Sequence, residues 1–362
     1  MRPFPLSIFA IAATLMLAAC ASSTDPAVSG HPDLSGTYNV ATLTPLERPD
    51  QFSERLTLTD EEADAIAARV QAFLKRDSAP SDPNRDAPEA GGTEFFIPGF
   101  EFAAGGVGGY NGFFIELGDS NFKLDGKWRT SIITAPSSGK LPPLSERGQA
   151  RVATIRQSAF MKNTGTAWWI DHEIGPYDDP ELRPLGERCL LGFGSTSGPP
   201  ALPVMYNNLK RIVQTQNSVM ILSEMNHDAR VVRMNSKHLP RDVRKWMGDS
   251  IGWWEGDTLV VDTTNFRGLS GLYLYGASEA LHVVERFSRL DDKTLRYSFT
   301  VEDPNTWEHA WSGEYPWPST NEQVYEYACH EGNYALGGIL RGARLLEHEA
   351  LAACETGAAG SD

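Results

Sequence analysis

The chain has 362 residues, and its 47 acidic against 32 basic side chains give a formal net charge of -15. A chain this acidic repels phosphate backbones and anionic lipid head groups, so nucleic-acid binding is excluded as a function class. The content of 9 Trp, 11 Tyr, 33 Gly and 23 Pro indicates many strands and turns.

The N-terminal apolar run ends in the motif LAAC at 17–20, the spacing read by the bacterial lipoprotein signal peptidase. We expect residues 1–19 to be removed as a signal peptide and Cys20 to be acylated, which would tether the mature protein to a membrane. A membrane-spanning helix, the alternative, needs about 20 apolar residues, and this run is shorter. Ala21 favours the periplasmic face of the outer membrane. Residues 20–33 have the small, polar composition of a flexible tether.

Residues 34–95 are predicted to form an N-terminal segment with one helix and a loop. The helix is expected over 59–76, because apolar residues recur there at helical spacing and Thr59 and Glu62 have the spacing of a capping box. The stretch 77–92 is rich in Pro, Asp and Gly and is predicted to be a loop.

Residues 96–348 are predicted to form a β-rich core domain. Apolar and polar residues alternate strictly through 295–302, the pattern of a strand with one buried face. Acidic turns at 255–257 and 291–293 separate pairs of apolar runs and predict hairpins. Successive hairpins favour a mainly β fold: an antiparallel meander that closes into a barrel (or sandwich), with a few flanking helices.

Three further segments complete the prediction. A second helix is expected over 145–161, and a short one from Pro240, since proline is favoured in the first turn of a helix. Residues 349–362 are rich in Ala and Gly and are expected to be a disordered tail.

Long motifs recur through the chain in one order: ERCL at 187–190, YNN at 206–208, HDAR at 227–230, WEGDTLVV at 254–261, LHVVERF at 281–287 and YACHEGNY at 327–334. They resemble the motifs of a family of exported bacterial proteins, frequent in proteobacteria and acidobacteria, for which no activity is established. The resemblance covers nearly the whole mature chain. It implies export and one shared architecture, and it implies no catalytic residue.

Besides Cys20, the cysteines are Cys189, Cys329 and Cys354. An exported protein meets an oxidising compartment, so one disulfide is expected and one thiol is left over. We prefer a Cys189–Cys329 disulfide because Cys354 lies in the predicted tail, although the other pairings stay open. The cysteines and histidines do not have the spacing of a zinc site, and we expect no metal and no cofactor.

The first candidate site lies on the segment 219–232. If this segment is one strand, alternation places Glu224, Asp228 and Arg230 on one face and His227 on the other. The polar face is either a solvated row of ion pairs or the lining of a pocket. In the second case His227 would act as a general base.

Other candidates are more isolated. His330 and Glu331 follow a predicted strand end, where polar groups reach a barrel mouth, although a structural hydrogen bond would also explain His330. His282 lies on a predicted strand and is a candidate for substrate binding. Arg188 follows the acidic loop 171–179, which either binds a cation or solvates a turn.

Standard motifs narrow the chemistry. The chain lacks the GxSxG, HExxH and P-loop motifs, and the glycine-rich run 105–112 does not fit GxGxxG.

Three hypotheses for the function remain. Two of them involve a small-molecule partner, and the third, an envelope assembly factor, is weaker. The first is a metal-independent lyase, isomerase or hydrolase acting on a small, partly aromatic molecule; the second is a lipoprotein that binds an apolar ligand or envelope component in the barrel. For the enzyme, the catalytic candidates are His227, Asp228, His330 and Glu331, and the substrate-binding candidates are Arg188, Arg230, Glu224 and His282.

Overall fold

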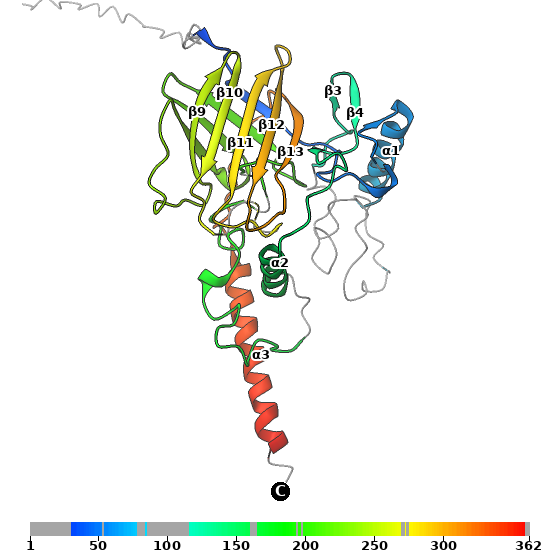
Figure 1. Cartoon of the computed structure of the whole chain (residues 1–362). Coiled ribbons are helices and arrows are strands. Elements are labelled where there is room, and N and C mark those ends of the chain that lie inside the picture. Colours follow the sequence, from blue (N-terminus) through cyan, green and yellow to red (C-terminus); the bar gives the residue numbers. More distant parts are fainter. Residues whose placement is uncertain are drawn as a thin grey trace, which may run out of the picture.

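The computed structural model describes residues 30–52, 54–77, 84, 116–159, 165–192, 195–196, 198–268, 272 and 275–358. The predicted signal peptide, Cys20 and the glycine-rich run 105–112 lie outside the described residues, as do most of the tether and of the loop 77–92. Figure 1 shows one large curled sheet, with a small sheet and helix α1 beside it and helix α3 projecting from one end.

The large sheet has ten strands in the order β1-β6-β7-β8-β9-β10-β11-β12-β13-β5 and confirms the mainly β fold. Neighbouring strands are antiparallel except β8 and β9, which run parallel. From β6 to β13 the neighbours follow chain order, and there the meander is interrupted once, by the crossover connection between β8 and β9. The bounds are β1 (Gly36–Asn39), β5 (Ile133–Ala135), β6 (Leu209–Gln214), β7 (Ser218–Ser223), β8 (Ala229–Met234), β9 (Asp249–Glu255), β10 (Thr258–Thr264), β11 (His282–Arg289), β12 (Thr294–Glu302) and β13 (Trp311–Pro318).

The curl of the sheet brings β1, at one edge, next to the end of β13. Tyr38 on β1 forms an isolated antiparallel bridge with Ser319, directly after β13. The backbone N–H of Thr320 donates a hydrogen bond of 2.9 Å to the carbonyl of Thr37. Because β1 thereby joins β13, the sheet surrounds its own apolar face, which is how a curled sheet protects its edges.

The inner face of the sheet is a packed aromatic core. The alternation predicted for 295–302 is confirmed on β12, where Leu295, Tyr297, Phe299 and Val301 are at most 2% exposed. The Tyr297 ring lies 4.9 Å from the ring of Trp317 on β13. Such ring pairs add about 0.5–1.5 kcal/mol each beyond the area they bury, and they leave little room inside this part of the sheet.

Shorter elements flank the core. A three-stranded sheet contains β2 (Thr57–Leu58), β4 (Lys127–Arg129) and β3 (Lys123–Leu124). Helix α1 (Asp60–Asp77) begins at the predicted capping box: the N–H of Glu62 donates to Thr59 Oγ1, and the N–H of Thr59 donates to a Glu62 carboxylate oxygen. Helix α2 (Glu146–Ala159) lies within the range predicted for a second helix. Three short 3-10 helices are η2 (Asp50–Phe52), η4 (Pro180–Leu182) and η5 (Met225–His227).

Several boundaries differ from the sequence prediction. Strand β1 pairs with β6, so the segment 34–95 contributes to the main sheet instead of standing apart. No helix begins at Pro240, since the residues after it form turns. The predicted disordered tail is wrong through residue 358, because helix α3 (Tyr334–Ala358) occupies this stretch.

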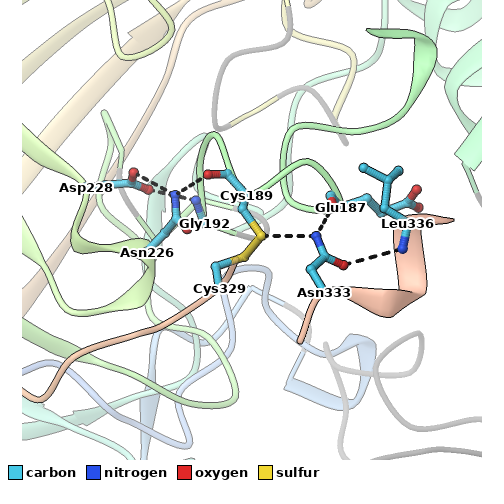
Figure 2. The surroundings of a disulfide bond; sticks show 8 residues. All are labelled: Glu187, Cys189, Gly192, Asn226, Asp228, Cys329, Asn333 and Leu336. Atoms are coloured by element: carbon cyan, nitrogen blue, oxygen red, sulfur yellow. Dashed lines mark hydrogen bonds between the residues drawn. A yellow bond between two sulfur atoms is a disulfide. The ribbon is translucent and has the colours of Figure 1, made fainter. Parts of the chain in front are cut away.

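Helix α3 is stabilised at its start and along one side. Asn333 accepts a hydrogen bond from the N–H of Leu336 at 3.4 Å, the contact of a helix N-cap (Figure 2). Ala343, 4% exposed, packs in a cluster with Trp169, and the indole N–H of Trp169 donates to Glu347 at 2.5 Å. A composition rich in Ala and Gly does not prevent a helix that is capped and packed in this way.

The segment 219–232 is not one strand. Strand β7 ends at Ser223, η5 follows, and β8 begins at Ala229. Asn226 has φ of 60° and His227 has φ of 52°, so both residues are in the left-handed region and the chain reverses there. The alternation argument for Glu224, Asp228 and Arg230 therefore fails, because these residues do not share a strand.

Candidate functional site

The interior of the curled sheet holds a buried ion pair. The guanidinium of Arg230 on β8 donates to both carboxylate oxygens of Glu285 on β11, at 2.6 and 2.8 Å. The hydroxyl of Tyr297 donates to Glu285 at 2.8 Å. Burial, followed by the charge of Glu285, raises the pKa of Tyr297, so this phenol remains a donor. Arg230 is therefore a core residue. It is 3% exposed, so it is not positioned to contact a ligand at the surface.

A cleft of about 520 Å³ lies instead outside the core, where β6 begins and β7 ends. Most of its walls come from three places in the sequence: the residues before β6, the end of β7, and the chain that follows β13. We call it the acidic cleft, and its lining residues are Glu116, Tyr206, Asn207, Leu209, Glu224, Glu322, Gln323, Tyr325 and Tyr327.

Glu224 is the buried member of this lining. It follows the last residue of β7, its N–H donates to the carbonyl of Leu209, and the residue is only 6% exposed. Among the described residues its carboxylate makes no hydrogen bond and no ion pair. Burying a carboxylate without a partner is costly, so its position on the wall of a cleft is the most informative feature of the site.

Two further carboxylates stand close to each other in the cleft. The amide nitrogen of Asn39, at the end of β1, donates to Glu116 at 2.6 Å and to Glu322 at 3.2 Å. Burial, and then the charges of Glu322 and Glu224, raise the pKa of Glu116, against the hydrogen bond from Asn39, which lowers it. The cleft therefore concentrates negative charge that its own polar groups do not neutralise.

A buried lysine lies behind the cleft wall, on the inner face of β6. The ammonium of Lys210 donates to the carbonyl of Thr196 and to the hydroxyl of Ser223, the latter at 3.1 Å. Burial lowers the pKa of Lys210 to about 7, although the charges of Asp228 and Glu224 act in the opposite direction. No ion pair joins Lys210 to either carboxylate in the described part of the chain.

The turn after Glu224 holds the outer wall of the cleft. Nε2 of His227 accepts a hydrogen bond from the N–H of Tyr327 at 2.9 Å and lies 3.2 Å from the carbonyl of Tyr325. His227 is an exposed residue. Its observed role is to fasten the segment 322–329 to the end of β7.

Figure 2 shows the second fastening of this wall. Cys189 and Cys329 form the disulfide that the sequence analysis preferred, across 140 residues of sequence. Asp228 accepts a hydrogen bond from the N–H of Gly192 at 2.7 Å and one from the amide of Asn226 at 3.3 Å. The same Asn226 amide donates to the carbonyl of Cys189 (Figure 2). These bonds use the carboxylate of Asp228 to hold the loop that carries the disulfide.

The remaining candidates lie elsewhere. His330 and Glu331 are exposed, and their side chains make no hydrogen bond or ion pair with the described residues. Arg188 donates to the carbonyl of Glu181 at 3.3 Å and so supports the η4 region. Of the eight catalytic and substrate-binding candidates, only Glu224 lines the acidic cleft, although His227 and Asp228 support its wall.

His282 belongs to a separate chain of groups on the outer face of the sheet. Its Nε2 lies 3.0 Å from Asp262, and His238 lies 2.8 Å from the other oxygen of that carboxylate. The hydrogen bond with Asp262 raises the pKa of His282. Burial opposes ionisation of Asp262, but hydrogen bonds from His282 and His238 outweigh it and lower the pKa of this carboxyl. The three groups fasten the connection between β8 and β9 to the sheet.

Within the residues that the structure describes, no group of His, Cys, Asp and Glu side chains is arranged to hold a metal ion. The same residues contain no helix long and apolar enough to cross a membrane. Comparisons with protein-family models, with curated proteins and with solved structures find no match to this chain.

Sequence reasoning missed most of the cleft. Glu116, Glu322 and the tyrosines come from distant segments, and their meeting depends on the pairing of β1 with β6 and on the path of the chain after β13. Lys210 could have been found, since it shares strand parity with the apolar Ile212 and therefore faces inward.

Proposed function

We propose that the protein is a small-molecule-binding lipoprotein, anchored through Cys20 at the periplasmic face of the outer membrane, and that its binding site is the acidic cleft. The observation that carries the proposal is Glu224, a residue only 6% exposed whose carboxylate makes no hydrogen bond or ion pair with the described residues, on the wall of a cleft of about 520 Å³. Clefts of this size are typical of ligand sites in which a few polar groups set the orientation of the ligand.

The packing of the core also supports a site outside the sheet. Tyr297, Leu295 and Trp317 on its inner face are fully buried, so this part of the interior is occupied by the protein's own side chains. A ligand held there, as the sequence analysis expected, would have to displace the aromatic core. The acidic cleft needs no such rearrangement.

The test is to fill the cleft and ask whether binding is lost. Gln323 lines the cleft and is exposed, so Gln323→Trp adds bulk there with little cost to folding. Gln51→Trp, at an exposed position away from the cleft, is the matched control. Compounds that raise the melting temperature of the wild-type protein in a library screen should lose this effect with Q323W and keep it with Q51W. Equal stabilisation of both variants by every such compound would contradict the proposal.

Acid–base catalysis in the same cleft is a second candidate. It is favoured by Glu116, whose pKa is raised by burial and by the nearby charges of Glu322 and Glu224. Carboxyl groups whose environments separate their proton affinities can act as a general acid and a general base. In that case Glu116→Gln should abolish turnover of a bound compound while the dissociation constant stays within about twofold; binding without any turnover by the wild-type protein would exclude it.

A further inference from the structure

We propose that the ligand of the acidic cleft is an organic cation, an alkylammonium compound with one or more protonated amines. This inference rests on the proposed binding function of the cleft and adds the chemical class of the ligand. Three observations support it. The carboxylate of Glu224 has no hydrogen-bond or ion-pair partner among the described residues, the lining of the cleft is acidic, and tyrosine side chains form part of its walls.

The first observation is that the carboxylate of Glu224 has no hydrogen-bond or ion-pair partner among the described residues. The residue as a whole is 6% exposed, and neither a backbone N–H nor a basic side chain within the described residues bonds to its carboxylate. A protonated amine in the cleft would supply both the opposite charge and the hydrogen-bond donors. An anionic ligand, or a neutral one without a hydrogen-bond donor, would leave this carboxylate unpaired and more deeply buried than before, at a further cost.

The second observation is the balance of charge around the cleft. Glu116, Glu224 and Glu322 are all in the lining, and none of the lining residues that the structure describes is Lys or Arg. The basic side chain behind the wall, Lys210, directs its ammonium away to Thr196 and Ser223. Burial lowers the pKa of Lys210 to about 7, and one lysine at most offsets one of the three carboxylates. The net charge of -15 also favours the approach of cations from a distance.

The third observation separates an organic cation from a metal ion. A metal ion needs several ligand atoms converging on one point, and no such group of side chains occurs among the described residues. The cleft instead places Tyr206, Tyr325 and Tyr327 around the carboxylates. Aromatic rings attract ammonium groups through their faces and also contact the alkyl chain between the amines. Three carboxylates in one cleft can pair with more than one amine, which suits a ligand with two protonated amines.

The experiment is isothermal titration calorimetry on the full-length protein in a non-ionic detergent at low salt. The probes are 1,5-diaminopentane, pentylamine, tetramethylammonium and glutarate. We expect the diamine to bind most tightly, the monoamine and the quaternary ammonium more weakly, and the dicarboxylate not at all. Binding of the diamine should weaken as salt is added.

Glu224→Gln keeps the shape of the side chain and removes its charge, and it should raise the dissociation constant of the diamine by about 10- to 100-fold. The matched control is Glu181→Gln, whose side chain is 83% exposed and lies outside the lining. It should leave the dissociation constant unchanged. Because E224Q removes a buried charge without a partner, its melting temperature should equal or exceed that of the wild type, which separates lost binding from lost folding.

The outcomes distinguish the two proposals. If no amine binds but a neutral or anionic compound does, and Q323W abolishes that binding, the cation assignment is overturned while the proposed function stands. If the diamine binds E224Q and Q323W as tightly as the wild-type protein, the cleft is not its site and the assignment of the ligand is overturned. If no compound of any class depends on Gln323, the proposed function itself fails.

Discussion

The buried ion pair offers a sharp test of how the curled sheet is held together. Arg230 and Glu285 are 3% and 0% exposed, and two hydrogen bonds of 2.6 and 2.8 Å join them. Removing one member of a buried pair leaves the other charged in the core, which costs about 3–5 kcal/mol of unfolding free energy. We expect Glu285→Gln to cost this much. Because a guanidinium cannot shed its proton, Arg230 stays charged in this variant.

The converse change strands the other charge. Arg230→Met leaves the carboxylate of Glu285 in the core with its hydrogen bond from Tyr297 but without its ion pair, and we expect it to be strongly destabilising as well. The double variant R230M/E285Q contains neither charge and should lie within about 2 kcal/mol of the wild-type protein, since buried pairs are often replaceable by neutral groups. The coupling energy between the two sites is therefore expected to be large.

Urea denaturation of the wild type, both single variants and the double variant provides the measurement. Arg286→Met is the matched control, because Arg286 forms a pair of 2.8 Å with Glu255 in which both side chains are nearly half exposed. Such exposed pairs contribute at most about 1 kcal/mol. A loss as small as this for R230M would refute the structural role of the ion pair. Loss of ligand binding by R230M at unchanged stability would instead support the substrate-binding role expected from the sequence.

Three other predictions test separate parts of the structure. Thr59→Ala removes the side chain that caps α1 and should lower the unfolding free energy by about 1 kcal/mol, measured by urea denaturation. Replacing both Cys189 and Cys329 by Ser should cost about 2–4 kcal/mol and weaken binding in the acidic cleft, because the disulfide fastens its outer wall; unchanged affinity would show that the wall holds without it. The pair of His282 with Asp262 raises the pKa of the imidazole, so its stabilisation is complete below about pH 6.5 and is lost as pH rises through the raised pKa. His282→Asn should therefore destabilise the protein more at pH 6 than at pH 8.5, and equal melting-temperature losses at both pH values would contradict this.

Local signals in the sequence predicted local structure well. The alternation on β12, the capping box of α1 and the acidic turn before β10 each depend on residues within a few positions of one another. Such patterns are set by strand or helix geometry and by turn chemistry, which act over short stretches of chain. For the same reason the mainly β class could be predicted before the order of the strands was known.

Features that depend on distant segments were not predictable in this way. Asn39 and Glu322 are 283 positions apart, and the hydrogen bond between them forms only because β1 joins the end of β13. The pattern of residues 219–232 suggests one regular strand, but Asn226 and His227 adopt positive φ and form a turn there. The alternation of apolar and polar residues carries no information about this backbone conformation. The C-terminal helix was not predicted, because its stability depends on the cap at Asn333 and on packing against Trp169. Amino-acid composition reveals neither contact.

The most direct test of the account is a crystal structure of the protein soaked with 1,5-diaminopentane. We predict density for the diamine in the acidic cleft, with one amine within hydrogen-bond distance of the Glu224 carboxylate and the tyrosines along the alkyl chain. Density inside the curled sheet, with the ring of Tyr297 displaced from Trp317, would contradict the account, as would density confined to the surface outside the cleft.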